Sequence, residues 1–259
     1  MFSKEPRCIY RHNPLAEVIC QIRFPEILKI AQETPTDFQE AIRANFPQYA
    51  RRQEKPRIQL APGQPQAPLG EPVVNHHFSS ADGVWRVNLT SKFISLSCSR
   101  YTRWEEFARR LDAPLVALIR TYHPAYFERV GLRYVNFFSR KELELESAPY
   151  REMFAPWCLG PLSDPQVPEE GLSRSSVDCD VALRHNCRAK IHAGPGMVRR
   201  NGRQDPESKF VLDLDLYMQG NIPIKTCVGT LQTLHIQADS IFRGAITDVT
   251  HDAMEPIEK

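Results

Sequence analysis

Three runs of residues in the last third of the chain alternate between apolar and polar side chains. They cover residues 177–184, 187–193 and 209–218. A period of two places successive side chains on opposite faces of a β-strand, so each run predicts a strand with one apolar and one charged face. The charged positions are Asp178, Asp180, Arg184, Arg188, Lys190, His192, Asp213 and Asp215. If the strands are neighbours, these ionisable groups share one surface.

Three interpretations of that surface are open. The first is a solvated face, common in antiparallel sheets, on which each cross-strand pair contributes about 0.2–1 kcal/mol. The second is a divalent-cation site on the four aspartates, because hard cations prefer carboxylate oxygens. With Lys190 and His192 nearby, such a site would suit a metal-dependent phosphodiesterase or nuclease. The third is a surface that binds a charged partner.

Residues 194–206 predict a long basic loop between the second and third of these strands. Their sequence is G-P-G-M-V-R-R-N-G-R-Q-D-P, in which Arg199, Arg200 and Arg203 could contact nucleic-acid phosphates. The loop lacks the aromatic residues on which bases stack in single-strand binders. The formal net charge of the whole chain is only +2. Nucleic-acid binding is therefore a less favoured hypothesis.

The rest of the chain predicts more strands and three main helices. Strand patterns cover residues 17–24, 73–79, 85–90, 93–99 and 127–138, and helix patterns cover 36–49, 102–122 and 225–246. Along the chain the order is β-α-β-β-β-α, followed by β, a short helical turn and β-β-β-α. We predict an α+β protein whose antiparallel sheets carry helices on one face. The repeated order indicates a duplication with halves 1–125 and 126–259, or else one continuous domain.

Composition and motifs narrow the class of protein. The apolar fraction of 42% and the charged fraction of 25% are ordinary for a globular protein. The seven cysteines contain no C-x-x-C pair, which favours a reducing compartment, and no signal peptide or membrane span is recognisable. We therefore expect a cytoplasmic protein. Nucleophile, phosphate-loop and zinc motifs are absent from the sequence, so we name no catalytic residue, expect no cofactor and lean against an enzyme.

Four segments resemble an uncharacterised family of sporadically distributed bacterial proteins of similar length. They are N-P-L-A-E-V-I-C-Q-I-R-F at 13–24, the helical F-Q-E-A-I-R and F-P at 38–47, V-L-D-L-D-L-Y at 211–217 and L-H-I-Q-A-D-S-I-F-R-G-A-I-T at 234–247. The resemblance implies a bacterial, cytoplasmic protein of accessory character, and it carries over no catalytic motif. We therefore expect a non-catalytic protein that acts through a surface, on another protein or on a second copy of itself.

Overall fold

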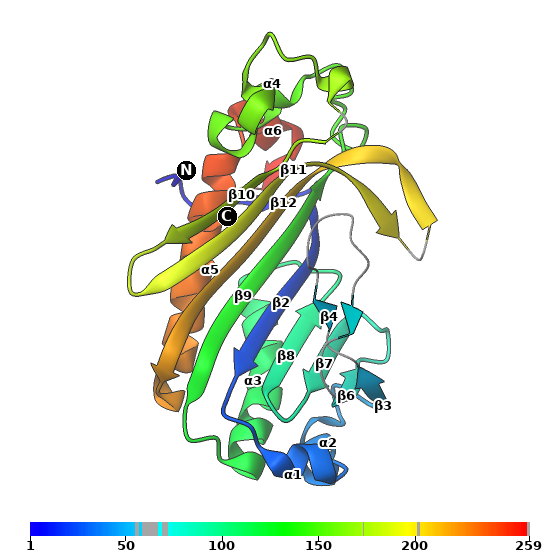
Figure 1. Ribbon diagram of the computed structural model, residues 1–259, viewed down its shortest axis with the longest axis vertical. Coiled ribbons are helices and arrows are strands. Elements are labelled where there is room, and N and C mark those ends of the chain that lie inside the picture. Colours follow the sequence, from blue (N-terminus) through cyan, green and yellow to red (C-terminus); the bar gives the residue numbers. More distant parts are fainter. Residues whose placement is uncertain (55–56, 59–66, 69–71, 173, 201–202, 258–259) are drawn as a thin grey trace. The chain divides into compact units, whose positions relative to one another are not determined.

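The computed structural model describes residues 1–54, 57–58, 67–68, 72–172, 174–200 and 203–257. Within these ranges one antiparallel sheet contains nine strands (Figure 1). In sheet order they are β10 (Val177–Ala182), β11 (Cys187–Arg200), β12 (Arg203–Ile222), β9 (Phe127–Phe138), β2 (Leu15–Arg23), β8 (Phe93–Cys98), β7 (Trp85–Leu89), β6 (Val73–Ser79) and β3 (Gln48–Glu54). Two short pairs accompany it, namely β1 (Ile9–Tyr10) with β13 (Pro256–Ile257) and β4 (Arg57–Ile58) with β5 (Ala67–Pro68). The predicted α+β class with antiparallel sheets is confirmed.

The chain divides into two compact units that are both discontinuous in sequence. Unit 1 consists of Met1–Val18, Gly131–Met218 and Val228–Lys259, and unit 2 consists of Ile19–Val130 and Gln219–Cys227. The expected division into halves 1–125 and 126–259 stays a prediction.

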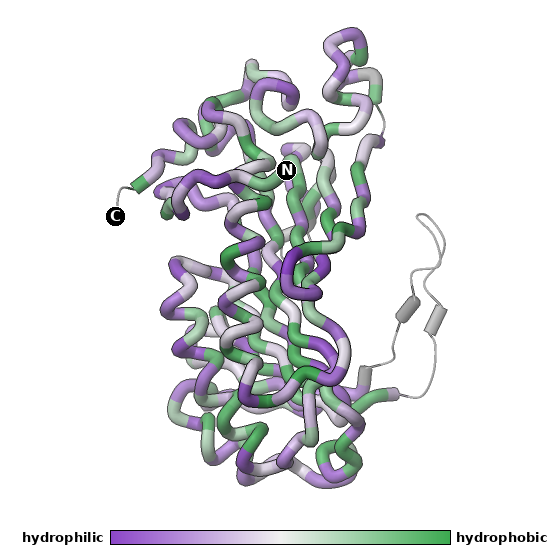
Figure 2. Tube along the Cα trace, turned by 90° about the vertical axis from the view of Figure 1, so that its left-hand side faces the viewer, coloured by the Kyte–Doolittle hydropathy of each residue, from purple (hydrophilic) through white to green (hydrophobic). Residues whose placement is uncertain are grey.

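In unit 1 a long helix covers one face of the sheet. Helix α5 (Cys227–Ala245) lies behind the strands in Figure 1 and buries Leu231, Leu234 and Ile241. Strand β12 buries Leu212, Leu214 and Leu216, while Asp213 and Asp215 between them lie on the opposite face. Shorter helical segments follow β9 and α5, namely α4 (Tyr150–Met153), three 3-10 turns (Pro156–Cys158, Gly160–Ser163, Glu169–Gly171) and α6 (Asp248–Ala253). The alternation of hydrophilic and hydrophobic residues is visible along the chain trace (Figure 2).

In unit 2 the helices are α1 (Leu28–Gln32), α2 (Thr36–Ile42) and α3 (Trp104–Tyr122). Helix α3 contains Pro114 in its interior and is not divided there. The helix expected over 36–49 is shorter, because α2 ends at Ile42 and Gln48–Glu54 form strand β3. Pro47 lacks the N–H that a continuing helix needs, and the Tyr49 ring packs 5.3 Å from the Phe78 ring across the β3–β6 pair.

The expected loop over 194–206 is wrong. Strand β11 continues to Arg200 and β12 begins at Arg203, with a register shift between Met197 and Arg199. Glycine and proline in this run had suggested a turn. At Gly194, however, φ is +154°, and a Cβ there would lie 2.5 Å from the Ser175 carbonyl oxygen. The glycine allows a close backbone approach inside a strand.

The predicted repeat of element order is present in the topology. After the opening strand of each half, a meander returns so that its last strand lies beside the first: β8 beside β2, and β12 beside β9. A helix of 19 residues follows each meander, α3 in one half and α5 in the other. In the first half the nine-stranded sheet contains one strand that we did not expect, β3, and the short strands β1, β4 and β5 outside this sheet were not expected either. A common origin of the two halves stays a prediction.

Candidate functional site

The three charged strands of unit 1 are direct neighbours in the sheet. Strand β11 pairs with β10 on one side and with β12 on the other, in unbroken antiparallel register over the charged positions. Two rows of ionisable side chains therefore cross the strands: Asp178, His192 and Asp213 form one, and Asp180, Lys190 and Asp215 form the other. We call these six residues, together with Arg133 of β9, the charged face.

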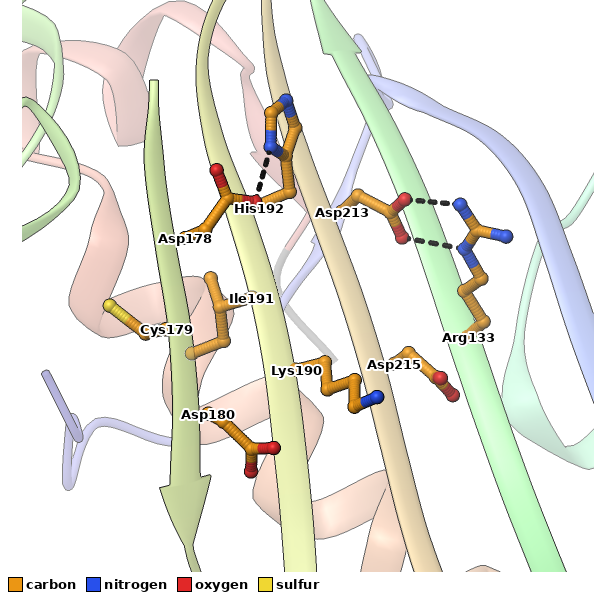
Figure 3. Close-up of a pocket in the computed structure, with 9 residues that line it drawn as sticks. All are labelled: Arg133, Asp178, Cys179, Asp180, Lys190, Ile191, His192, Asp213 and Asp215. Atoms are coloured by element: carbon orange, nitrogen blue, oxygen red, sulfur yellow. Dashed lines mark hydrogen bonds and ion pairs between the residues drawn. The ribbon is translucent and has the colours of Figure 1, made fainter. Parts of the chain in front are cut away.

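Ion pairs link side chains of different strands along the first row and extend it to Arg133. His192 Nδ1 lies 2.8 Å from Asp178 Oδ1. Arg133 binds Asp213 in a bidentate manner, with Nε 2.8 Å from Oδ1 and Nη2 2.5 Å from Oδ2 (Figure 3). Bidentate guanidinium–carboxylate pairs fix geometry as well as charge. The charged face is thus an ordered array in which acidic and basic side chains alternate along the first row, from Asp178 through His192 and Asp213 to Arg133.

Arg133 is a residue that the sequence analysis missed. Its hydrogen bonds to Asp213 raise the pKa of the Arg133 guanidinium, and the negative charges of Asp215 and Glu17 act in the same direction. The alternation of side chains along β9 does indicate that Arg133 faces outward. It lies on the same face as Val135 and Phe137, opposite the buried Leu132 and Tyr134. That β9 lies beside β12 could not be read from this pattern.

Lys190 lies at the centre of the second row. Its side chain extends over β12 toward Asp215 in Figure 3, and no ion pair within 4 Å involves it among the described residues. A hollow of about 400 Å³ surrounds it and is lined by all seven residues of the charged face together with Cys179 and Ile191. Lys190 is therefore an exposed basic residue on a strand that is paired on both sides.

The two remaining arginines of the predicted cluster are placed differently. Arg188 lies two residues before Lys190 on β11. It donates hydrogen bonds to Asp180 Oδ1 from Nη2 (2.8 Å) and from Nε (3.1 Å). Arg184 lies in the exposed turn after β10, beside His185 and Asn186, which both adopt positive φ. The structure thus brings Arg188 next to the charged face and leaves Arg184 at its end.

The geometry does not favour the divalent-cation site. Asp178 and Asp213 lie two strands apart, roughly 10 Å at the usual spacing, with His192 between them. Asp178, Asp180 and Asp213 each direct an oxygen at a basic side chain. In the part of the chain that the structure describes, no three His, Cys, Asp or Glu side chains form a group that could hold a metal ion.

We expect magnesium or manganese to leave the melting temperature of the protein unchanged. A ligand stabilises a fold only where the folded state binds it, and the carboxylates here are separated and paired. Thermal unfolding of the wild type and of the Asp213→Ala/Asp215→Ala variant, each with and without the metal, measures this. A metal-dependent rise in the wild type that disappears in the variant would instead show that these aspartates bind the metal, and would favour the phosphodiesterase hypothesis.

The arginines of the expected basic loop lie away from the charged face. Arg199 is opposite Gln204, and Arg200 is opposite Arg203, at the far end of the β11–β12 hairpin. Arg200 lies eight positions after His192, which is roughly 26 Å along a strand. The backbone positions of these arginines are therefore distant from those of the aspartates.

A second hollow in unit 1, of about 870 Å³, was not predicted. It lies where an irregular segment, residues 146–172 and 174–175, meets Pro195–Met197 and Ser208. Inside it the Arg140 guanidinium lies 3.7 Å from the centre of the Tyr150 ring and 2.5 Å from Glu169 Oε2. Glu169 also accepts a hydrogen bond from the Tyr150 backbone N–H. Arg140, which precedes the irregular segment, thus contacts two residues within it, Tyr150 and Glu169. The feature of the sequence that could have indicated this hollow is the concentration of acidic residues and prolines in the segment.

Comparison with models of known families finds no match for the chain, and a search of curated proteins finds none either. The resemblance to a sporadically distributed bacterial family stays a prediction. Among the helices that the structure describes, none has the length and apolar character needed to cross a membrane.

Proposed function

We propose that this protein is a non-catalytic binding module that recognises another protein through the charged face. The observation that carries the proposal is the acid–base alternation across adjacent strands, with Arg133 fixed on Asp213 and Lys190 at the centre. Charges held on a sheet lose little freedom when a partner docks. A patterned array of this kind gives specificity and fast, salt-sensitive association.

The chemistry of the face favours a protein partner over a nucleic acid. Four aspartates lie among Arg133, Arg188 and Lys190, so the surface has no excess positive charge to attract phosphates. A protein surface with its own alternating charges can match both signs. All seven cysteines are free thiols, which supports our expectation that the partner is met in the reducing cytoplasm.

Site-specific photo-crosslinking tests this function. A photoreactive amino acid replaces Lys190 in one protein and Val228 in another, because Val228 is exposed on α5 and lies outside the charged face. In cells we expect one discrete protein adduct from position 190 and none from position 228. The adduct should disappear when about 0.5 M salt screens the surface charges during crosslinking in a lysate.

Identification of the adduct by mass spectrometry is followed by binding of the purified partner to the unmodified protein. We expect the Asp215→Lys variant to bind it at least about tenfold more weakly, a loss of about 1.4 kcal/mol. The variant must retain the wild-type melting temperature. Equal adducts from both positions, or unchanged affinity in the variant, would contradict the proposal.

A further inference from the structure

Strand β10 forms one edge of the nine-stranded sheet, and the register shows which of its backbone groups are unpaired in the ladder. The Leu183 N–H donates to the Cys187 carbonyl at 2.8 Å, so these two residues form a hydrogen-bonded pair. Hydrogen-bonded pairs alternate with non-bonded pairs along an antiparallel ladder. The groups of Val177, Cys179 and Val181 therefore point toward β11, and those of Asp178, Asp180 and Ala182 point outward from the sheet.

The inner face of this edge is incompletely covered. Val177, Cys179 and Val181 remain half-buried, while the residues directly opposite them on β11 are Ala193, Ile191 and Ala189, which are 0–2% exposed. The layer of apolar side chains that is fully buried on β11 is therefore only partly buried on β10. One more strand beyond β10 would complete it.

The exposed aspartates of β10 determine which charge an added strand can carry. Asp178 and Asp180 are both exposed, and β11 already satisfies them with His192 and Arg188 from the other side. An antiparallel pairing of β10 with a second copy of itself, centred on residue 178, 179 or 180, places aspartate against aspartate. Like charges directly opposite each other are destabilising, so the edge disfavours self-pairing and admits a basic neighbour.

We propose that β10 accepts an extended segment of a partner protein as a tenth strand, and that this segment alternates apolar residues with lysine or arginine. Apolar side chains would cover Val177, Cys179 and Val181, and basic side chains would face Asp178 and Asp180. Backbone hydrogen bonds then supply affinity and the alternate side chains supply specificity. This inference rests on the proposed function and names the class of partner for the same surface.

A synthetic probe tests strand addition directly. The peptide acetyl-Val-Lys-Val-Arg-Val-Lys-amide has the six residues of β10's own length. There are two matched controls. One carries glutamate in place of the basic residues. The other retains every side chain but is N-methylated at the basic residues, which lie opposite the outward-pointing groups of β10. By isothermal titration calorimetry we expect the probe to bind at least about tenfold more tightly than either control. In hydrogen–deuterium exchange it should slow the amides of Asp178, Asp180 and Ala182.

Two protein variants separate backbone pairing from charge. Ala182→Pro removes an outward N–H without breaking the ladder to β11, and proline is tolerated at such edge positions. Ala182→Ser retains the N–H and is its control. We expect Ala182→Pro to lose at least about tenfold in affinity for the probe and Ala182→Ser to bind like the wild type. If Ala182→Pro does not fold, the N-methylated peptide decides the question.

Equal binding of the N-methylated peptide, or slowed exchange elsewhere than in β10, would overturn strand addition. That failure is distinct from failure of the proposed function. A partner adduct at position 190 that persists in Ala182→Pro would support the charged face as a binding surface and contradict only strand addition at β10. Absence of the adduct at position 190 in the otherwise unmodified protein would contradict both proposals.

Discussion

Replacing Phe210 by alanine is expected to lower the free energy of unfolding by about 3–5 kcal/mol, the usual cost of removing a buried aromatic ring. Phe210 is fully buried and stacks on Phe154, with 3.8 Å between ring centres and 16° between planes. The Tyr150 ring lies 5.3 Å away. The lost ring would leave a cavity between β12 and the irregular segment. Urea denaturation monitored by circular dichroism measures the change.

The control for this prediction is the next residue on the strand. Val211 lies on the other face of β12 and is half-buried, so Val211→Ala should cost about 1 kcal/mol or less. The comparison isolates burial, because both variants shorten a side chain at neighbouring positions of one strand. A Phe210→Ala protein no less stable than Val211→Ala would show that the apolar layer beneath the hairpin is wrongly placed.

Replacing Gly194 by alanine is expected to cost more than about 2 kcal/mol and to displace the start of β10. Its φ of +154° is unfavourable for a residue with a side chain, and strain of this kind costs about 1–3 kcal/mol. The added methyl group would also lie 2.5 Å from the Ser175 carbonyl oxygen and 3.0 Å from the Ser176 Cα. Both contacts are with the backbone that leads into β10, so neither can be relieved by a side-chain rotation.

Gly196 provides the matched control two residues along the same strand. A Cβ there meets only the Val211 Cγ2 atom, at an ordinary 3.5 Å. We expect Gly196→Ala to change the melting temperature little, or to raise it, because alanine restricts the unfolded chain. Equal destabilisation by the two substitutions would mean that Gly194 has no special part in holding the edge strand.

Local periodicity predicted the parts of the charged face that depend on one strand at a time. Alternation placed Asp178, Asp180, Asp213 and Asp215 on the side opposite the apolar residues, because a strand has only two faces. The short turn after Leu183 then limited the possible registers of β10 against β11. The position of Arg133 could not be predicted, since it depends on β9 lying beside β12, a long-range pairing.

The errors in the predicted fold have local physical causes. The run 194–206 contains three glycines and two prolines and looked like a loop, yet β12 supplies a partner strand across it. The start of strand β3 is not visible in the sequence, because the helical spacing of Ile42 and Phe46 continues to Tyr49. In both places tertiary pairing outweighed local propensity.

A charge-swap measurement tests binding through the charged face most directly. Once the crosslinked partner and its contacting residue are identified, its affinity is measured for the wild type, for Asp215→Lys, and for Asp215→Lys with the opposite reversal in the partner. We predict a loss of at least about tenfold in the single variant and recovery of most of it in the paired reversal. Affinity within about twofold of the wild type in all combinations would contradict binding through this face.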